Sequence, residues 1–266
     1  MTTTVSMPSV SNEQLPMDQI QKRVTAEEWA VRTDLAATYR LVALYGWDDM
    51  IFTHLSARVP GPENHFLINP YGFLFDEITA SSLVKIDLEG NVVLDNGHPV
   101  NSAGFTIHSA IHGASESAHA VMHCHSNDGV AVSCMQGGLL ALSQTACVIH
   151  RDVAYHDYEG VALNPEEKAR LIADMGDKHI LILRNHGTLT VGSTVAECFL
   201  RLYYLERACT YQVKAMSGGE LVLPAEEAVS STAELGSIPG VIGQIGDLAW
   251  PALLRKLDRN NPGYSK

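Results

Sequence analysis

Short segments typical of β-strands alternate with helical segments along most of this chain, and this alternation restricts the fold more than any other feature. The strand-like segments are residues 52–59, 65–69, 83–87, 92–94, 118–125, 147–155 and 179–184, the last of which residues 188–191 could continue. The helical segments are residues 25–45, 105–113, 127–135, 164–175, 194–216 and about 248–257, whereas residues 217–247 are expected to form loops. This order predicts a single layered α/β domain.

Two of the helices are predicted most clearly by the residues at their ends. Thr25 and Glu28 form a capping-box pattern, and the helix that they begin is expected to end at Gly46. Thr194 and Glu197 repeat the pattern at the start of the longest helix. In this pattern the threonine hydroxyl accepts a hydrogen bond from a backbone amide that the helix itself leaves unpaired.

The two ends of the chain differ from its middle. Residues 1–22 are polar, contain two prolines and lack periodicity, which predicts a flexible N-terminal arm and no secretory signal. We expect a folded domain over residues 23–220 and a C-terminal extension over residues 221–266. The extension carries a short amphipathic helix, which could cover the chain's own sheet or a neighbouring subunit.

Composition excludes two classes of protein. Eighteen basic and thirty acidic residues give a net charge of −12, whereas nucleic acids and anionic membranes attract basic surfaces. No apolar run approaches the ~18 residues of a membrane span. The five cysteines are scattered without a Cys-x-x-Cys pair, as expected for reduced thiols. We therefore expect a cytoplasmic protein without nucleic-acid or membrane partners.

Histidine is the unusual residue type, with twelve in the chain and eight of them between residues 98 and 156. His123 and His125 are two apart on a predicted strand, so both side chains point to the same face and could bind one metal ion. A solvated pair on a strand face would show the same pattern. His186 follows an apolar strand and precedes Gly187, where the chain can turn. It is the third candidate ligand, and three neutral nitrogens with one open position are typical of catalytic sites.

Six segments between residues 51 and 187 resemble the class II aldolase/adducin family, most closely the adducin head domain and its bacterial relatives. They are residues 51–58, 65–72, 78–85, 103–111, 153–158 and 181–187. The resemblance implies a three-layer α/β/α sandwich with a largely antiparallel central sheet. It also implies a metal site at His123, His125 and His186, and homo-oligomers, often tetramers, with active sites near subunit interfaces.

The chain also departs from the sugar-phosphate aldolases of that family. Their proton-transfer glutamate is Gly104 here, so the usual base is missing. Their phosphate-binding segments are replaced by Thr53-His54, Ser102-Ala103 and Asn69-Pro70-Tyr71-Gly72. A phosphorylated triose is therefore not the expected substrate. The candidate substrate-binding residues are His54, Asn69, Ser102 and Gly104.

Tyr155 and His108 are the candidates for the missing acid or base. Tyr155 lies near the segment that carries the family's catalytic tyrosine, and His108 comes four residues after Gly104. A cation nearby can move the pKa of a phenol or an imidazole. The alternatives are a strand tyrosine with a satisfied hydroxyl and a histidine on a buried helix face.

Three functions remain open. The favoured one is a metal-dependent lyase that acts on a C–C bond next to a carbonyl, by aldol chemistry or decarboxylation, on a small non-phosphorylated substrate. Zinc is the expected cofactor, with manganese or iron as alternatives. The second function is a non-enzymatic, adducin-like interaction module with a vestigial metal site, for which family analogy alone suggests an actin-type partner. The third is an Fe(II)-dependent oxygenase. In each case we expect a homo-oligomer, with a tetramer favoured.

Overall fold

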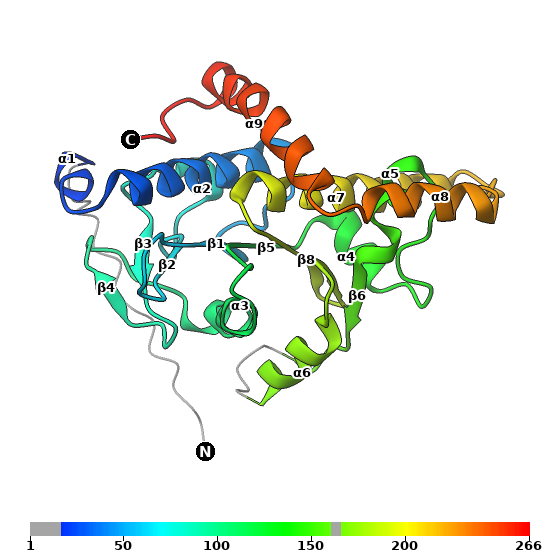
Figure 1. Cartoon of the computed structure of the whole chain (residues 1–266), viewed down its shortest axis with the longest axis horizontal. Helices are drawn as coiled ribbons and strands as arrows, with labels where there is room; N and C mark the ends of the chain where they lie inside the picture. Colours follow the sequence, from blue (N-terminus) through cyan, green and yellow to red (C-terminus); the bar gives the residue numbers. More distant parts are fainter. Residues whose placement is uncertain (1–16, 161–165) are drawn as a thin grey trace.

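One sheet of eight strands lies at the centre of the chain (Figure 1). The computed structural model describes residues 17–160 and 166–266. The strands are β1 (His54–Arg58), β2 (Phe66–Ile68), β3 (Val84–Ile86), β4 (Val92–Leu94), β5 (Ala120–Cys124), β6 (Val153–His156), β7 (Ile180–Leu183) and β8 (Gly187–Gly192). Their order is β4-β3-β2-β1-β5-β8-β7-β6, and every pair is antiparallel except β6 with β7. The largely antiparallel sheet is confirmed.

Helices cover both faces of this sheet. The helices are α1 (Met17–Gln21), α2 (Ala26–Tyr45), α3 (Ser102–Ala114), α4 (Asn127–Ser133), α5 (Gln144–Ile149), α6 (Glu167–Met175), α7 (Val195–Ser217), α8 (Glu226–Gly236) and α9 (Val241–Asn260). In Figure 1, α2, α7 and α9 lie above the sheet, and α3 and α6 lie below it. The predicted α/β/α sandwich is therefore confirmed. No helix in the described ranges is long and apolar enough to cross a membrane.

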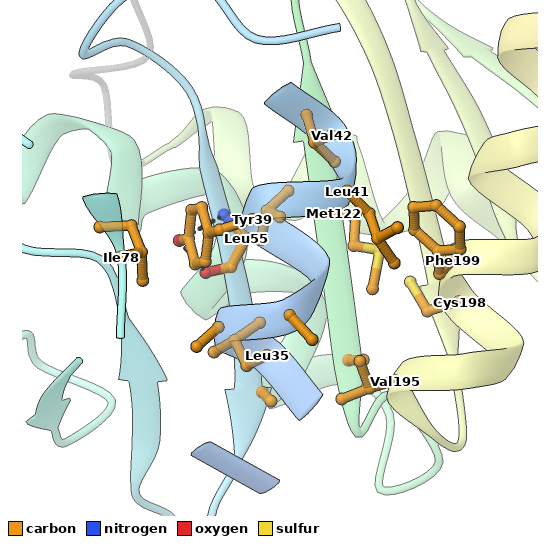
Figure 2. Packing of buried hydrophobic residues seen from close by; sticks show 14 of the residues in the cluster. Leu35, Tyr39, Leu41, Val42, Leu55, Ile78, Met122, Val195, Cys198 and Phe199 are labelled. Atoms are coloured by element: carbon orange, nitrogen blue, oxygen red, sulfur yellow. Dashed lines mark hydrogen bonds between the residues drawn. The ribbon is translucent and has the colours of Figure 1, made fainter. Parts of the chain in front are cut away.

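Successive side chains of β5 point alternately to the two helical layers. Met122 packs with Leu41 of α2 and Phe199 of α7 in the larger core (Figure 2). Val121 faces the other way and packs in a second core with residues of α3 and α6. Successive strand residues point to opposite faces, so His123 shares the face of Val121. The sheet therefore directs the first candidate ligand toward the α3 layer.

Both predicted helix starts are confirmed. The Thr25 hydroxyl accepts a hydrogen bond from the Glu28 amide at 3.1 Å, and the helix ends at Gly46, which has a φ of 72°. The Thr194 hydroxyl accepts a hydrogen bond from the Glu197 amide, also at 3.1 Å. These local signals predict boundaries well because capping involves residues only three apart.

The strand predicted over residues 147–155 is wrong in its first half. Residues up to Ile149 belong to α5, a short 3-10 turn follows, and β6 begins only at Val153. Ser143 caps α5 by accepting a hydrogen bond from the Ala146 amide at 3.2 Å. The buried side of α5 packs in a core that includes residues of α7, so tertiary contacts decide this segment.

Residues 188–191 form a separate strand instead of continuing β7. The chain reverses at Asn185, which has a φ of 55°, and β8 returns antiparallel to β7 with Leu181 opposite Leu189. Asparagine tolerates the left-handed region better than most residues do. The turn therefore depends on Asn185, and the hairpin places His186 between the two strands.

The C-terminal extension is more helical than predicted. Residues expected to be loop form α8 and the start of α9, and α9 packs along α7 and α2. A Cβ at Gly246 would lie 3.0 Å from the Ala196 carbonyl, so this glycine permits close approach of the two helices. Trp250 donates a hydrogen bond to Asp34 of α2 at 2.9 Å. At the N-terminal end, residues 17–21 of the predicted flexible arm form α1, in which Ile20 is fully buried, whereas residues 1–16 lie outside the described residues.

Candidate metal centre

His123, His125 and His186 come together at one end of β5. The three ring centroids are 4.8 Å apart in every pair, and one nitrogen from each ring lies within 4.8 Å of the others. In the described part of the chain, no other group of His, Cys, Asp and Glu side chains meets this criterion. We call these residues the histidine triad. Small side-chain movements would bring these nitrogens close enough to share one ion, whose bonds to imidazole are ~2.0–2.1 Å long.

The outer nitrogens of two triad histidines, His123 and His125, already have partners. His123 Nδ1 lies 2.9 Å from the Thr188 carbonyl, which can only accept, so this nitrogen carries the hydrogen. His125 Nδ1 lies 3.1 Å from an Asp49 carboxylate oxygen, whereas its Nε2 is buried and has no partner among the described residues. Such outer contacts orient metal-binding imidazoles and direct the other nitrogen inward. The triad therefore fits a divalent metal ion.

Burial favours the neutral, metal-binding form of two triad histidines, His186 and His123. Desolvation, followed by the neighbouring imidazole of His125, lowers the pKa of His186 to about 4. Desolvation also lowers the pKa of His123 well below its usual value, with further contributions from His186 and His125. Neutral imidazoles have the free lone pair that a metal ligand needs.

Backbone strain is concentrated around this centre. Met50, Thr53 and Asn185 have φ values of 51°, 66° and 55°, and they are the non-glycine residues with positive φ in the described ranges. Each one directly follows Asp49 or directly precedes His54 or His186. Threonine is β-branched and rarely adopts this conformation. Strain of this kind persists where the surrounding structure holds a functional geometry in place.

Gly187 has a different role from the predicted one. The turn is made by Asn185, and Gly187 is needed for close packing between β8 and β5. A Cβ at Gly187 would lie 2.5 Å from the Cys124 carbonyl and 3.0–3.3 Å from the rings of His125 and His123. A glycine at this position therefore allows the hairpin to approach the triad.

His54 and His108 lie beside the triad. His54 is directly opposite His123 in the antiparallel pairing of β1 with β5, so both side chains project from the same face. The His54 and His108 ring centroids are 6.0 Å apart, and the Nε2 atom of each is buried without a partner among the described residues. Burial, followed by His125, lowers the pKa of His54 to about 4. Both candidates therefore lie at the site as neutral groups.

Ser56 and His112 extend the group formed by His54 and His108, and neither was predicted as a site residue. Ser56 Oγ lies 2.6 Å from His108 Nδ1 and 2.7 Å from His112 Nε2. His112 Nδ1 lies 2.7 Å from the Ala118 carbonyl. A signal was present in the sequence, because residues 54 and 56 share a strand face and residues 108 and 112 share a helix face.

Tyr155 and Asn69 form hydrogen bonds with residues outside the triad. The Tyr155 hydroxyl accepts a hydrogen bond from the Leu139 amide at 3.0 Å, and the Arg184 guanidinium lies 4.3 Å from the centroid of its ring. The backbone amide of Asn69 donates a hydrogen bond to the Tyr39 hydroxyl at 3.1 Å in the core. The roles predicted for Tyr155 and Asn69 stay predictions.

Two further candidates lie in the first turn of α3. Ser102 and Gly104 belong to this helix, but their side-chain positions are outside the described residues. The substrate-binding role that the sequence predicts for them stays a prediction. Their helix carries His108 one turn later, so both are on an element of the site.

Glu206 is a buried acid that the sequence did not identify. It lies in α7, accepts hydrogen bonds from the hydroxyls of Ser126 and Thr188, and is 2.6 Å from the latter. Desolvation raises its pKa to about 7. Ser126 follows one triad histidine, and the Thr188 carbonyl holds another. Glu206 therefore binds two residues that adjoin the triad. These contacts form only because α7 packs against the sheet.

Known proteins are similar to this chain in sequence. The pattern of the class II aldolase and adducin N-terminal domain matches residues 33–213. A Caulobacter vibrioides protein whose name places it among class 2 aldolases is 59% identical over 252 residues, which cover 94% of this chain and 98% of that protein. Alpha-adducin of Mus musculus is 42% identical over 252 residues, covering 89% of this chain and 34% of the adducin. This chain therefore spans about a third of that adducin's length.

Two solved structures share the fold. An aldolase II superfamily protein from Pseudomonas syringae is 49% identical and superposes with a TM-score of 0.86, over 93% of this chain and 99% of that one. L-fuculose 1-phosphate aldolase from Glaciozyma antarctica is 29% identical, with a TM-score of 0.78 over 89% of this chain and 93% of that one.

Proposed function

Because the chain belongs to the class II aldolase and adducin family, we propose that it is a metal-dependent lyase. It would make or break a C–C bond next to a carbonyl group, by aldol chemistry or decarboxylation. The observation that carries this proposal is the meeting of the imidazoles of His123, His125 and His186, two of which are oriented by hydrogen bonds. A divalent cation held there supplies a Lewis acid for a carbonyl or enolate oxygen.

The chain's own groups hold and shape this site. Asp49 and the Thr188 carbonyl orient His125 and His123, so these rings keep one nitrogen directed inward. Three nitrogen ligands suit zinc, with manganese or iron as alternatives. Among the described residues, no hydrogen bond or ion pair of the triad involves an arginine or a lysine. This supports a small, non-phosphorylated carbonyl substrate.

A second candidate function is a non-enzymatic interaction module of the adducin type. The 42% identity to alpha-adducin favours it, since that similarity covers 89% of this chain. In this case the triad would be structural or vestigial, and the partner would be a protein of the cytoskeleton. An Fe(II)-dependent oxygenase is a third outcome that the same triad allows.

Elemental analysis of the protein, purified without chelator, tests these proposals. We expect about one equivalent of zinc or manganese per chain in the wild type and in His119→Ala, whose imidazole is exposed and outside the triad. We expect His123→Ala to lose the metal, because two nitrogens hold an ion far more weakly than three. Iron in place of zinc would favour the oxygenase. The absence of any bound metal would favour the interaction module.

A further inference from the structure

The hydrogen bonds around Ser56 determine where the hydrogen of His108 lies. The Ala118 carbonyl can only accept, so His112 Nδ1 donates to it and the neutral ring accepts at Nε2. The Ser56 hydroxyl then donates its single hydrogen to His112 Nε2, at 2.7 Å. Ser56 Oγ in turn accepts from His108 Nδ1, at 2.6 Å. His108 Nε2 is therefore left with a free lone pair.

This assignment requires that both rings are neutral. His108 and His112 are 0% and 1% exposed, and no carboxylate is among their described contacts. A buried imidazolium without a counter-ion is strongly disfavoured. Desolvation accordingly lowers the pKa of His108 well below its usual value and that of His112 to about 3.

The free lone pair of His108 Nε2 lies beside the triad, and none of the described residues donates a hydrogen bond to it. His108 Nε2 and His54 Nε2 are buried without partners among the described residues, and the two ring centroids are 6.0 Å apart. His54 is directly opposite the metal-ligand candidate His123. An unpaired buried acceptor is destabilising, and a ligand that donates a hydrogen bond to it would remove this penalty.

We propose that His108 and His54 form a neutral subsite that binds a hydroxyl group of a substrate held at the triad, with His108 Nε2 as the acceptor. Ser56 and His112 are positioning residues, because they fix the tautomer of His108. The substrate class is an unphosphorylated hydroxycarbonyl compound. A phosphate ester would place negative charge against a lone pair, and no described contact of His54 or His108 involves arginine or lysine. This inference rests on the proposed function, since the hydroxyl belongs to a metal-bound ligand.

The tautomer is tested first, on metal-free protein. In two-bond ¹H–¹⁵N spectra of ¹⁵N-histidine-labelled protein we expect His108 in the Nδ1–H form, assigned by comparison with His108→Leu. Ser56→Ala should shift His108 toward the Nε2–H form, whereas Ser56→Thr, which keeps the hydroxyl, should retain the wild-type signal. A wild-type His108 in the Nε2–H form or as an imidazolium at pH 7 would overturn the proposal. This spectrum is independent of metal, so it is informative even if the proposed function fails.

Ligand binding is tested next, on zinc-loaded protein. Dihydroxyacetone and hydroxyacetone differ by one hydroxyl group. A hydrogen bond of ordinary strength to that group predicts a roughly three- to tenfold lower dissociation constant for dihydroxyacetone. His108→Leu should abolish the preference while its zinc content stays at the wild-type level. Equal affinity of the wild type for both probes would contradict the subsite, and so would much tighter binding of dihydroxyacetone phosphate. Loss of zinc in the wild type would instead contradict the proposed function.

Discussion

At the scale of single residues, burial disfavours the charged forms of several polar groups beside the site, and Glu206 is one case. In the folded, metal-free protein its pKa is raised to about 7 by desolvation. It therefore binds a proton between pH 4.5 and 7 that the unfolded chain releases, so the free energy of unfolding should fall as pH rises through this range. We expect this loss, about 1–3 kcal/mol, to be absent in Glu206→Gln. Urea unfolding of both proteins between pH 5 and 8 measures it. Parallel pH profiles would show that Glu206 is ionised throughout.

At the scale of elements, the β7–β8 hairpin delivers His186 to the other two histidines, and Gly187 sets how closely it approaches. Because a Cβ there would lie 2.5 Å from the Cys124 carbonyl, we expect Gly187→Ala to displace the hairpin. The strain should lower the free energy of unfolding by about 1–3 kcal/mol and reduce the bound metal. Gly218→Ala is the matched control, because its Cβ would have 3.5 Å to the nearest carbonyl. Denaturant titration and metal analysis of both variants check this, and full metal content in Gly187→Ala would contradict it.

At the scale of the whole molecule, apolar side chains remain exposed on α8, on α9 and in the segment between them. Leu235 is 57% exposed, Ile238 48% and Leu248 82%. Exposed apolar groups in one region are typical of interaction surfaces, so we expect a homo-oligomer, with a tetramer favoured and α9 at or near a contact. Light scattering should then give about four times the chain mass of 28.9 kDa. Leu248→Glu should shift the protein to smaller species without lowering its thermal stability greatly. A wild-type mass of one chain at micromolar concentration would contradict the prediction.

Local patterns predicted much of this fold. The caps at Thr25 and Thr194 act over three residues, and alternating polarity identified most strands, so both features could be recognised without tertiary information. The spacing of His123 and His125 on a strand, together with the family resemblance, was also enough to predict that these residues come together with His186. Residues 147–149 were assigned wrongly because their conformation depends on packing against α7.

The sequence alone determined which residue types reach the centre, namely two histidines on one strand face and a third after an apolar strand. Only the tertiary structure decided what surrounds them. Asp49 and Glu206 come from a loop and a helix of the opposite layer, and no periodicity links them to the histidines. The physical reason is that a hydrogen bond between residues far apart in the chain depends on strand register and helix packing, which arise from the sum of many weak contacts.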